Sequence, residues 1–192
     1  AFLIAVFLIS FILVSQFNSI VKPIIILSSV VMSTAGVFYG LVTFQMAFGL
    51  MAFLGLISLA GVVVNNAIVL IDYVDILRDR DGFDLRSALV QAGKVRFRPV
   101  ILTAITTTLG LVPLAIGFNF DFITLVNNPL EFFTHLGEYI YWGGEQAAWW
   151  GPMAIAVIVG LLFSTFLTLI LVPVLYSVIE RGKQSMQHLF FG

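Results

Sequence analysis

Two amides and a carboxylate interrupt an otherwise apolar stretch between Gly61 and Asp72. Asn65 and Asn66 are adjacent, and Asp72 follows Asn65 two helical turns later. The hydrocarbon core of a bilayer has no water to solvate such groups, so at that depth they need protein partners or a wet cavity. Because residues seven apart share a helix face, Asn65 and Asp72 are predicted to lie on one side of a helix. These three side chains are the first candidates for chemistry.

A second polar stripe lies further along the chain. Thr103, Thr106, Thr107 and Gly110 recur at helical spacing, just after Arg96 at the basic start of their segment. A threonine hydroxyl can also bond a carbonyl of its own helix, which leaves the role of Thr106 and its neighbours open. Thr103 is the preferred candidate because it lies nearest the basic residues.

The composition identifies the surroundings in which these residues act. Of the 192 residues, 60% are hydrophobic and 10% are charged, and the mean hydropathy is +1.10. A soluble domain carries about 25% charged residues, so this is an integral membrane protein that contacts the lipid bilayer. The net charge of -1 does not favour nucleic-acid binding. Neither His-Glu-x-x-His nor Gly-x-Ser-x-Gly occurs, so we predict neither an enzyme nor a bound cofactor.

Membrane spans must position the polar stripes. A span needs about 20 apolar residues, and cutting the chain at its charged and Pro- or Gly-marked breaks gives five of them. The predicted fold is therefore an all-α membrane protein, a five-span transmembrane helical bundle. The predicted spans are residues 1–17, 24–43, 48–77, 99–117 and 152–179. Asp84 is expected to cap a short helix over 84–93 that lies on the membrane surface and stops at Gly93.

All nine basic residues fall on one side of this arrangement. They follow the first, third and fifth spans or lie between the third and fourth. By the positive-inside rule that side is cytoplasmic, so the N-terminus is predicted outside and the C-terminus inside. The loop of residues 118–151 has no Lys or Arg and fits the outer face as a periplasmic loop. Because the chain begins inside an apolar run without a leader, we interpret it as a fragment of a longer polypeptide.

Small residues predict how the spans pack. Rows with a small residue every three or four positions let helix backbones approach closely. One such row lies on the second span and one on the fifth, and in the third span Gly55 and Ser58 are expected to continue the face of Asn65. The two rows are Ser29, Ser33, Gly36 and Gly40, and Gly160, Ser164 and Thr168.

The outer loop carries two further observations. It is rich in aromatic residues, which indicates an interfacial belt rather than a substrate site. His135 and Glu138 are spaced as metal ligands on a helix would be, but no further ligand lies nearby. We therefore predict no metal site.

Several motifs occur in a recognisable order. Gly61 to Asp72 is followed by the run 92–103, which reads Ala-Gly-Lys-Val-Arg-Phe-Arg-Pro-Val-Ile-Leu-Thr. Leu-Gly-Leu-Val-Pro-Leu at 109–114, Trp-Gly-Pro-Met at 150–153 and Val-Pro-Val-Leu-Tyr at 172–176 come next. Together they resemble the C-terminal membrane region of resistance-nodulation-division (RND) efflux permeases of the hydrophobe/amphiphile branch. The resemblance covers essentially the whole chain and implies the last five of twelve helices.

That resemblance implies a mechanism and partners. In the family, a carboxylate pair on a helix outside this chain binds and releases protons, which drives multidrug or amphiphile export from the bacterial inner membrane. The positions facing that pair match Asn65, Asn66 and Thr103, with Arg96 at the cytoplasmic mouth and Asp72 at an acidic position. The implied partners are the N-terminal part of the transporter, two further copies in a homotrimer, a periplasmic adaptor and an outer-membrane channel. Substrate binding is expected outside this chain.

The match departs from the family at one position. The best-known members carry a lysine where Asn65 stands, whereas Asn66 agrees with the family. An amide can donate hydrogen bonds to a carboxylate but cannot neutralise its charge. The carboxylates facing Asn65 are therefore expected to titrate differently from those facing a lysine.

Two other functions fit part of the sequence. A related branch of the superfamily assists protein translocation, but the Trp-Gly-Pro-Met motif and the aromatic outer loop disfavour it. A non-transporting scaffold would use the asparagines only to join helices, because interhelical bonds of this kind contribute about 1 kcal/mol. That alternative accounts for Asn65 but not for the spacing of both polar stripes.

Overall fold

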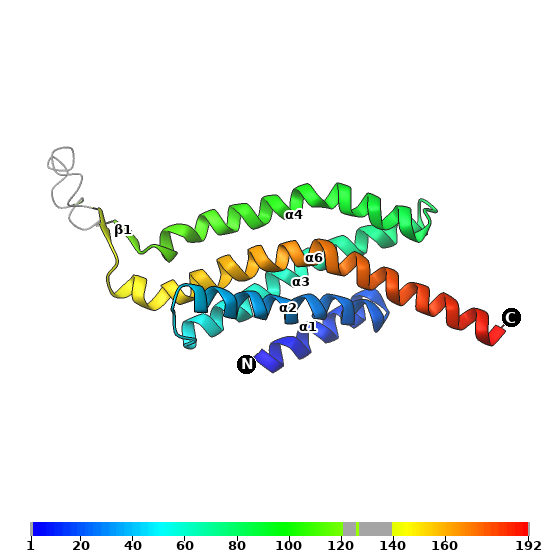
Figure 1. The fold of residues 1–192 in the computed structure, drawn as a ribbon, viewed down its shortest axis with the longest axis horizontal. Helices are drawn as coiled ribbons and strands as arrows, with labels where there is room; N and C mark the ends of the chain where they lie inside the picture. The colour runs from blue at the N-terminus through cyan, green and yellow to red at the C-terminus, as the bar shows by residue number, and fades with distance from the viewer. Residues whose placement is uncertain (1, 121–125, 127–139, 192) are drawn as a thin grey trace.

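Within the part of the chain that the structure describes, five helices and a small β-hairpin make up the fold. The computed structural model describes residues 2–120, 126 and 140–191. Successive helices run in opposite directions side by side, and α6 crosses in front of α3 (Figure 1). The elements are α1 (Phe2–Phe17), α2 (Val21–Thr43), α3 (Leu50–Asp79), α4 (Leu85–Ala115), β1 (Phe118–Phe120), β2 (Ile140–Trp142) and α6 (Glu145–Phe191).

The all-α membrane helical bundle is confirmed. Four helices are long and apolar enough to cross a membrane: α2, α3, α4 and the Glu145–Glu180 part of α6. The described helix α1 has 16 residues. At 1.5 Å per residue it extends about 24 Å, which is less than the ~30 Å hydrocarbon core. By length and composition, the described residues therefore contain four candidate spans and one shorter apolar helix, and the fifth span over residues 1–17 stays a prediction.

The small-residue rows predict close packing, and the structure shows that α2 and α6 are partners in it. A Cβ at Gly36 would lie 2.8 Å from Cβ of Phe163, and a Cβ at Gly40 would lie 2.7 Å from Cβ of Val159. Each of these helices therefore brings its backbone close to side chains of the other. Ser29, Ser33, Ser164 and Thr168 complete the two rows and are buried.

Helix α4 is longer than the sequence suggests. Asp84 caps it as predicted, because its carboxylate accepts a hydrogen bond from the backbone N–H of Arg86 at 3.2 Å. The predicted stop at Gly93 is wrong, since the helix continues to Ala115. Ala88 and Ala92 are fully buried in the core, so packing holds the helix together through the glycine.

The segment predicted as a loop over residues 118–151 contains two β-strands and the first turns of α6. Strands β1 and β2 pair antiparallel, with Phe118 opposite Trp142 and their rings edge to face at 5.5 Å. Helix α6 then begins at Glu145 rather than near residue 152, so Trp149 and Trp150 lie on its first turns. His135 and Glu138 lie outside the described residues.

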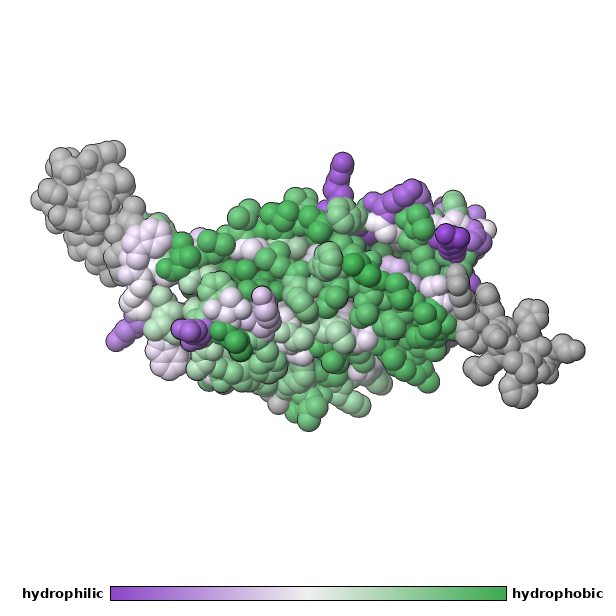
Figure 2. Space-filling view, viewed as in Figure 1, coloured by the Kyte–Doolittle hydropathy of each residue, from purple (hydrophilic) through white to green (hydrophobic). Residues whose placement is uncertain are grey.

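The two ends of the bundle differ in charge. We call the end with the connections at residues 18–20 and 80–84 the basic end, and the end with residues 44–49 and the β-hairpin the hairpin end. In the space-filling view, hydrophilic residues gather at the basic end while a broad apolar band covers the middle (Figure 2). The bundle therefore presents an apolar waist suited to lipid.

Candidate functional site

A polar stripe runs along an exposed face of α3. Ser58, Gly61, Asn65 and Asp72 are all exposed, whereas the residues between them on other faces are largely buried. Asn65 lies at the midpoint of this 30-residue helix. Asn65 and Asp72 therefore share a face, as the sequence predicts.

Gly55 does not belong to that stripe. It is buried, and a Cβ there would lie 2.9 Å from the backbone oxygen of Met153 on α6. The sequence reading joined Gly55 to Ser58 because three residues make almost one helical turn. A step of three residues rotates by about 300°, which is 60° short of a full turn. This difference places Gly55 on the α6 side of α3 and Ser58 on its exposed side.

The two asparagines differ in their surroundings. Asn66 is 9% exposed, whereas its neighbour Asn65 is on the open face. Among the residues that the structure describes, no hydrogen bond or ion pair joins Asn65, Asn66 or Asp72 to another side chain. The Asn65 amide and the Asp72 carboxylate are thus accessible to groups outside the described bundle, whereas Asn66 is buried.

Arg96 contacts α3 through an aromatic ring. Its guanidinium carbon lies 4.6 Å from the ring centroid of Tyr73, within the range of a cation–π interaction. Its Nε is buried and has no hydrogen-bond partner in the described part of the chain. The structure therefore joins Arg96 to the residue next to Asp72.

The threonines of α4 bond within their own helix. The Thr103 hydroxyl donates to the Val100 carbonyl at 2.9 Å, and the Thr106 hydroxyl donates to the Leu102 carbonyl at 2.9 Å. Both residues are exposed. A hydroxyl that donates to its own helix can still accept a hydrogen bond through a free lone pair, so this bond leaves Thr103 able to bind a donor.

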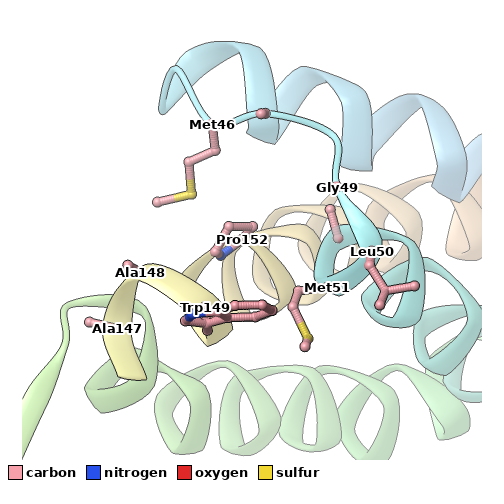
Figure 3. Close-up of a pocket in the computed structure, with 10 residues that line it drawn as sticks. Met46, Gly49, Leu50, Met51, Ala147, Ala148, Trp149 and Pro152 are labelled. Carbon is pink, nitrogen blue, oxygen red and sulfur yellow. The ribbon is translucent and has the colours of Figure 1, made fainter. Parts of the chain in front are cut away.

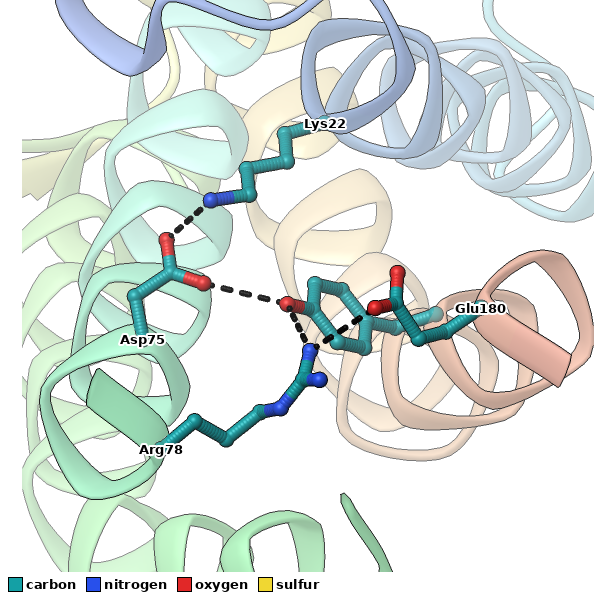
Figure 4. A network of polar contacts seen from close by, with 5 residues as sticks. Lys22, Asp75, Arg78 and Glu180 are labelled. Atoms are coloured by element: carbon teal, nitrogen blue, oxygen red, sulfur yellow. Dashed lines mark hydrogen bonds and ion pairs between the residues drawn. The ribbon is translucent and has the colours of Figure 1, made fainter. Parts of the chain in front are cut away.

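A cluster of charged residues ties three helices together at the basic end. Lys22 on α2 pairs with Asp75 on α3 at 2.7 Å, and Arg78 on α3 pairs with Glu180 on α6 at 3.2 Å. The Tyr176 hydroxyl connects the two pairs, because it donates to Asp75 at 3.0 Å and accepts from Arg78 at 3.3 Å (Figure 4). We call these five residues the ion-pair cluster.

The sequence alone does not predict the ion-pair cluster. Its partners are 53 to 102 residues apart, so no local pattern connects them. One signal was present: Asp75 and Arg78 are three residues apart on α3, which places opposite charges on one helix face. The cluster borders a cavity of about 810 Å³ that also includes Phe17 and Ile179.

A second cavity, of about 480 Å³, opens at the hairpin end. Met46, Met51 and the ring of Trp149 line it, with the Trp149 ring beside Met51 (Figure 3). The remaining lining comes from small and apolar residues at the start of α3 and α6. The lining contains no charged side chain.

Comparison with known proteins places this geometry in a family. Residues 1–119 match the AcrB/AcrD/AcrF family. The swarming motility protein SwrC of Bacillus subtilis (strain 168) is 36% identical over 185 residues, covering 96% of this chain and 15% of that protein. The multidrug resistance protein MdtC of Erwinia tasmaniensis is 30% identical over 168 residues, covering 88% of this chain and 14% of that protein. The chain thus spans about one seventh of these relatives.

The fold itself has a solved counterpart. A crystal structure of a heavy metal efflux pump superposes with a TM-score of 0.70 at 29% sequence identity, covering 92% of this chain and 14% of that chain. The helical arrangement, the order of motifs and the family match agree with one another. The chain belongs to the AcrB/AcrD/AcrF family of RND efflux transporters.

Proposed function

We propose that this chain supplies the hydrogen-bonding side of the proton-coupling site in a proton-driven RND exporter of multiple drugs or amphiphiles. Asn65, Asn66 and Thr103 form that side, Arg96 is accessory to it, and Asp72 lies on the same exposed face toward the basic end. The observation that carries the proposal is the placement of Asn65: an exposed amide at the midpoint of a long apolar helix.

The cost of that placement supports a polar partner. Moving an amide from water to an apolar medium without a hydrogen bond costs roughly 2–7 kcal/mol. Asn65 therefore faces protein or water rather than lipid. A carboxylate on a facing helix is a partner that an amide N–H binds well. In this role Asn65 holds and releases the ionised carboxylate as the proton arrives and leaves.

The membrane orientation and the assembly follow from the same proposal. The basic end is cytoplasmic by the positive-inside rule, and the hairpin end is periplasmic. The chain then works in a bacterial inner membrane, joined to the rest of the transporter in a homotrimer, with a periplasmic adaptor and an outer-membrane channel as partners. Export by proton antiport, rather than an enzymatic reaction, is the activity proposed.

Replacement of the Asn65 amide tests the proposal. In proteoliposomes carrying the complete transporter and an imposed pH gradient, Asn65→Leu is expected to abolish protonophore-sensitive export because leucine cannot bind the carboxylate. Gln16→Leu is the matched control, because it removes an exposed amide from another helix, α1. Unchanged coupled export in Asn65→Leu would remove Asn65 from the site.

The same assay separates the alternatives. A scaffold would show no transport, and its Asn65→Leu variant would change only helix association. A protein-translocation subunit would support secretion of an unfolded polypeptide and leave small amphiphiles inside the vesicles. Export that persists after the pH gradient is collapsed would exclude proton coupling while leaving the efflux assignment in place.

A further inference from the structure

Arg96 differs from the two cations beside it. Lys94 and Arg98 are exposed, whereas Arg96 is half-buried and its Nε is sealed from solvent. Residues two apart on a helix do not share a face, so the neighbours point elsewhere. Of these three cations, Arg96 is the one that stacks on an aromatic ring of α3, the ring of Tyr73.

The acidic groups near this junction do not hold Arg96. Asp75 is engaged by Lys22 and by the Tyr176 hydroxyl, and Asp72 is exposed on the open face of α3. A guanidinium is flat and weakly hydrated, so it stacks on an aromatic face more readily than an ammonium does. Among the described residues, the ring of Tyr73 is therefore the group that fixes the orientation of Arg96.

The contact between Tyr73 and Arg96 also determines how deep Asn66 and Thr103 lie along the bundle. Helices α3 and α4 run in opposite directions, so both lead from this contact toward the hairpin end (Figure 1). Asn66 lies seven residues from Tyr73 in that direction, and Thr103 lies seven residues from Arg96. At 1.5 Å per residue both steps cover about 10.5 Å on the same face of their helices. Asn66 and Thr103 therefore lie at one depth.

We propose that Tyr73 is a positioning residue of the coupling site: its ring holds the Arg96 guanidinium and thereby fixes the register of α3 against α4. This inference rests on the proposed function for its effect on transport. The ring is the working part, and the phenol hydroxyl is dispensable. Arg96 in turn is oriented from α3, the helix that carries Asn65 and Asn66.

Two substitutions separate the ring from the hydroxyl. In the complete transporter in proteoliposomes, Tyr73→Phe is expected to keep proton-coupled export within about twofold of the parent. Tyr73→Leu keeps an apolar side chain but loses the ring, and export should fall about tenfold, the order expected for a partly dry cation–π contact. In an Arg96→Gln background, Tyr73→Leu should cause no further loss. Tyr39→Leu on α2 is the control, because Tyr39 is exposed and distant.

A measurement that needs no transport tests the contact itself. In transporter labelled with ¹⁵N-arginine and reconstituted in lipid, ring currents should shift the Arg96 Nε–H proton upfield. That shift should survive Tyr73→Phe and disappear in Tyr73→Leu. An Arg96 resonance unmoved by Tyr73→Leu would overturn the contact, and equal export losses in the Phe and Leu variants would overturn the role of the ring.

The two proposals fail in different ways. Export that is insensitive to a protonophore would contradict the proton-coupled function. The Arg96 resonance would still show whether the Tyr73 ring holds the guanidinium. Proton-coupled export that Tyr73→Leu leaves intact sinks the positioning role alone.

Discussion

The Tyr176 hydroxyl donates a hydrogen bond to the Asp75 carboxylate at 3.0 Å, joining α6 to α3 across 101 residues of sequence. Tyr176 is 5% exposed, so water competes little for this bond. The same oxygen accepts from Arg78, which makes the hydroxyl the shared member of both ion pairs. The Tyr176 hydroxyl is therefore the group that links the two ion pairs of the cluster.

Tyr176→Phe should weaken the membrane bundle without changing its shape. The substitution leaves the ring in place but removes the donor to Asp75 and the acceptor for Arg78, at a cost of about 1–3 kcal/mol. Thermal unfolding of the complete transporter in detergent should show a lower melting temperature. Tyr39→Phe, at a 66% exposed position, should leave it unchanged. Equal melting temperatures for both variants would show that the Tyr176 hydroxyl contributes nothing to the stability of the bundle.

Gly160→Ala should be destabilising because the space beside it is filled. A Cβ there would overlap Leu59, and it would lie 2.8 Å from Cγ2 of Val37. Both neighbours are fully buried and cannot swing away. Overpacking of this kind costs about 1–3 kcal/mol. The measurement is the yield of folded transporter after a heating series.

Gly93→Ala is the matched control for Gly160→Ala. No atom lies within 4 Å of a Cβ built at Gly93, and the residue stands inside α4. Alanine at an open helical position is favoured over glycine by up to about 1 kcal/mol. The Gly93 variant should therefore be as stable as the parent or more so. A loss similar to that of Gly160→Ala would contradict the continuous helix.

Thr103→Val should separate function from folding. Valine has nearly the shape of threonine, and the lost hydrogen bond runs only to Val100 within the same helix. The melting temperature should therefore stay within a few degrees of the parent. Proton-coupled export should fall about tenfold if the hydroxyl takes part in the coupling site, a loss of about 1.4 kcal/mol in transition-state stabilisation. Thr106→Val provides the comparison, since Thr106 makes the same type of bond one turn later.

Asp84→Ala should loosen the first turn of α4. The Asp84 carboxylate accepts hydrogen bonds from the backbone N–H groups of Arg86 and Ser87 and from the Ser87 hydroxyl. Loss of an N-cap costs about 1 kcal/mol. Amide hydrogen exchange at residues 85–88 should become about five- to tenfold faster, while the middle of α4 is unaffected. Asp81→Ala, exposed in the preceding turn, should change neither region.

Local patterns in the sequence predicted the parts of the fold that depend on helix periodicity. The small-residue rows of α2 and α6 and the cap at Asp84 are of this kind, because spacing alone places residues on a face or at a helix end. The shared face of Asn65 and Asp72 followed from the same rule. The exposure of that face required the structure, since helices α4 and α6 cover other sides of α3.

The errors arose where packing overrides local signals. Gly93 is a weak helix stop, and the burial of Ala88 and Ala92 keeps the helix continuous through it. Gly55 was predicted on the face of Asn65, but it lies on the side of α3 that α6 covers. The Tyr73–Arg96 contact and the ion-pair cluster join residues far apart in sequence. Such contacts depend on how helices are arranged, which hydrophobic periodicity does not specify.

The continuity of α4 gives the contact at Arg96 a mechanical reach. From Arg96 to Ala115 the helix extends about 28 Å, with Pro99 and Pro113 inside it, and β1 begins three residues later. A helix of this length acts as a lever when it tilts as a unit: a tilt of 10° about Arg96 carries its far tip about 5 Å sideways. A rearrangement at the basic end that tilts α4 therefore moves the β-hairpin, on the opposite side of the apolar waist, by a larger distance than it moves the residues near Arg96.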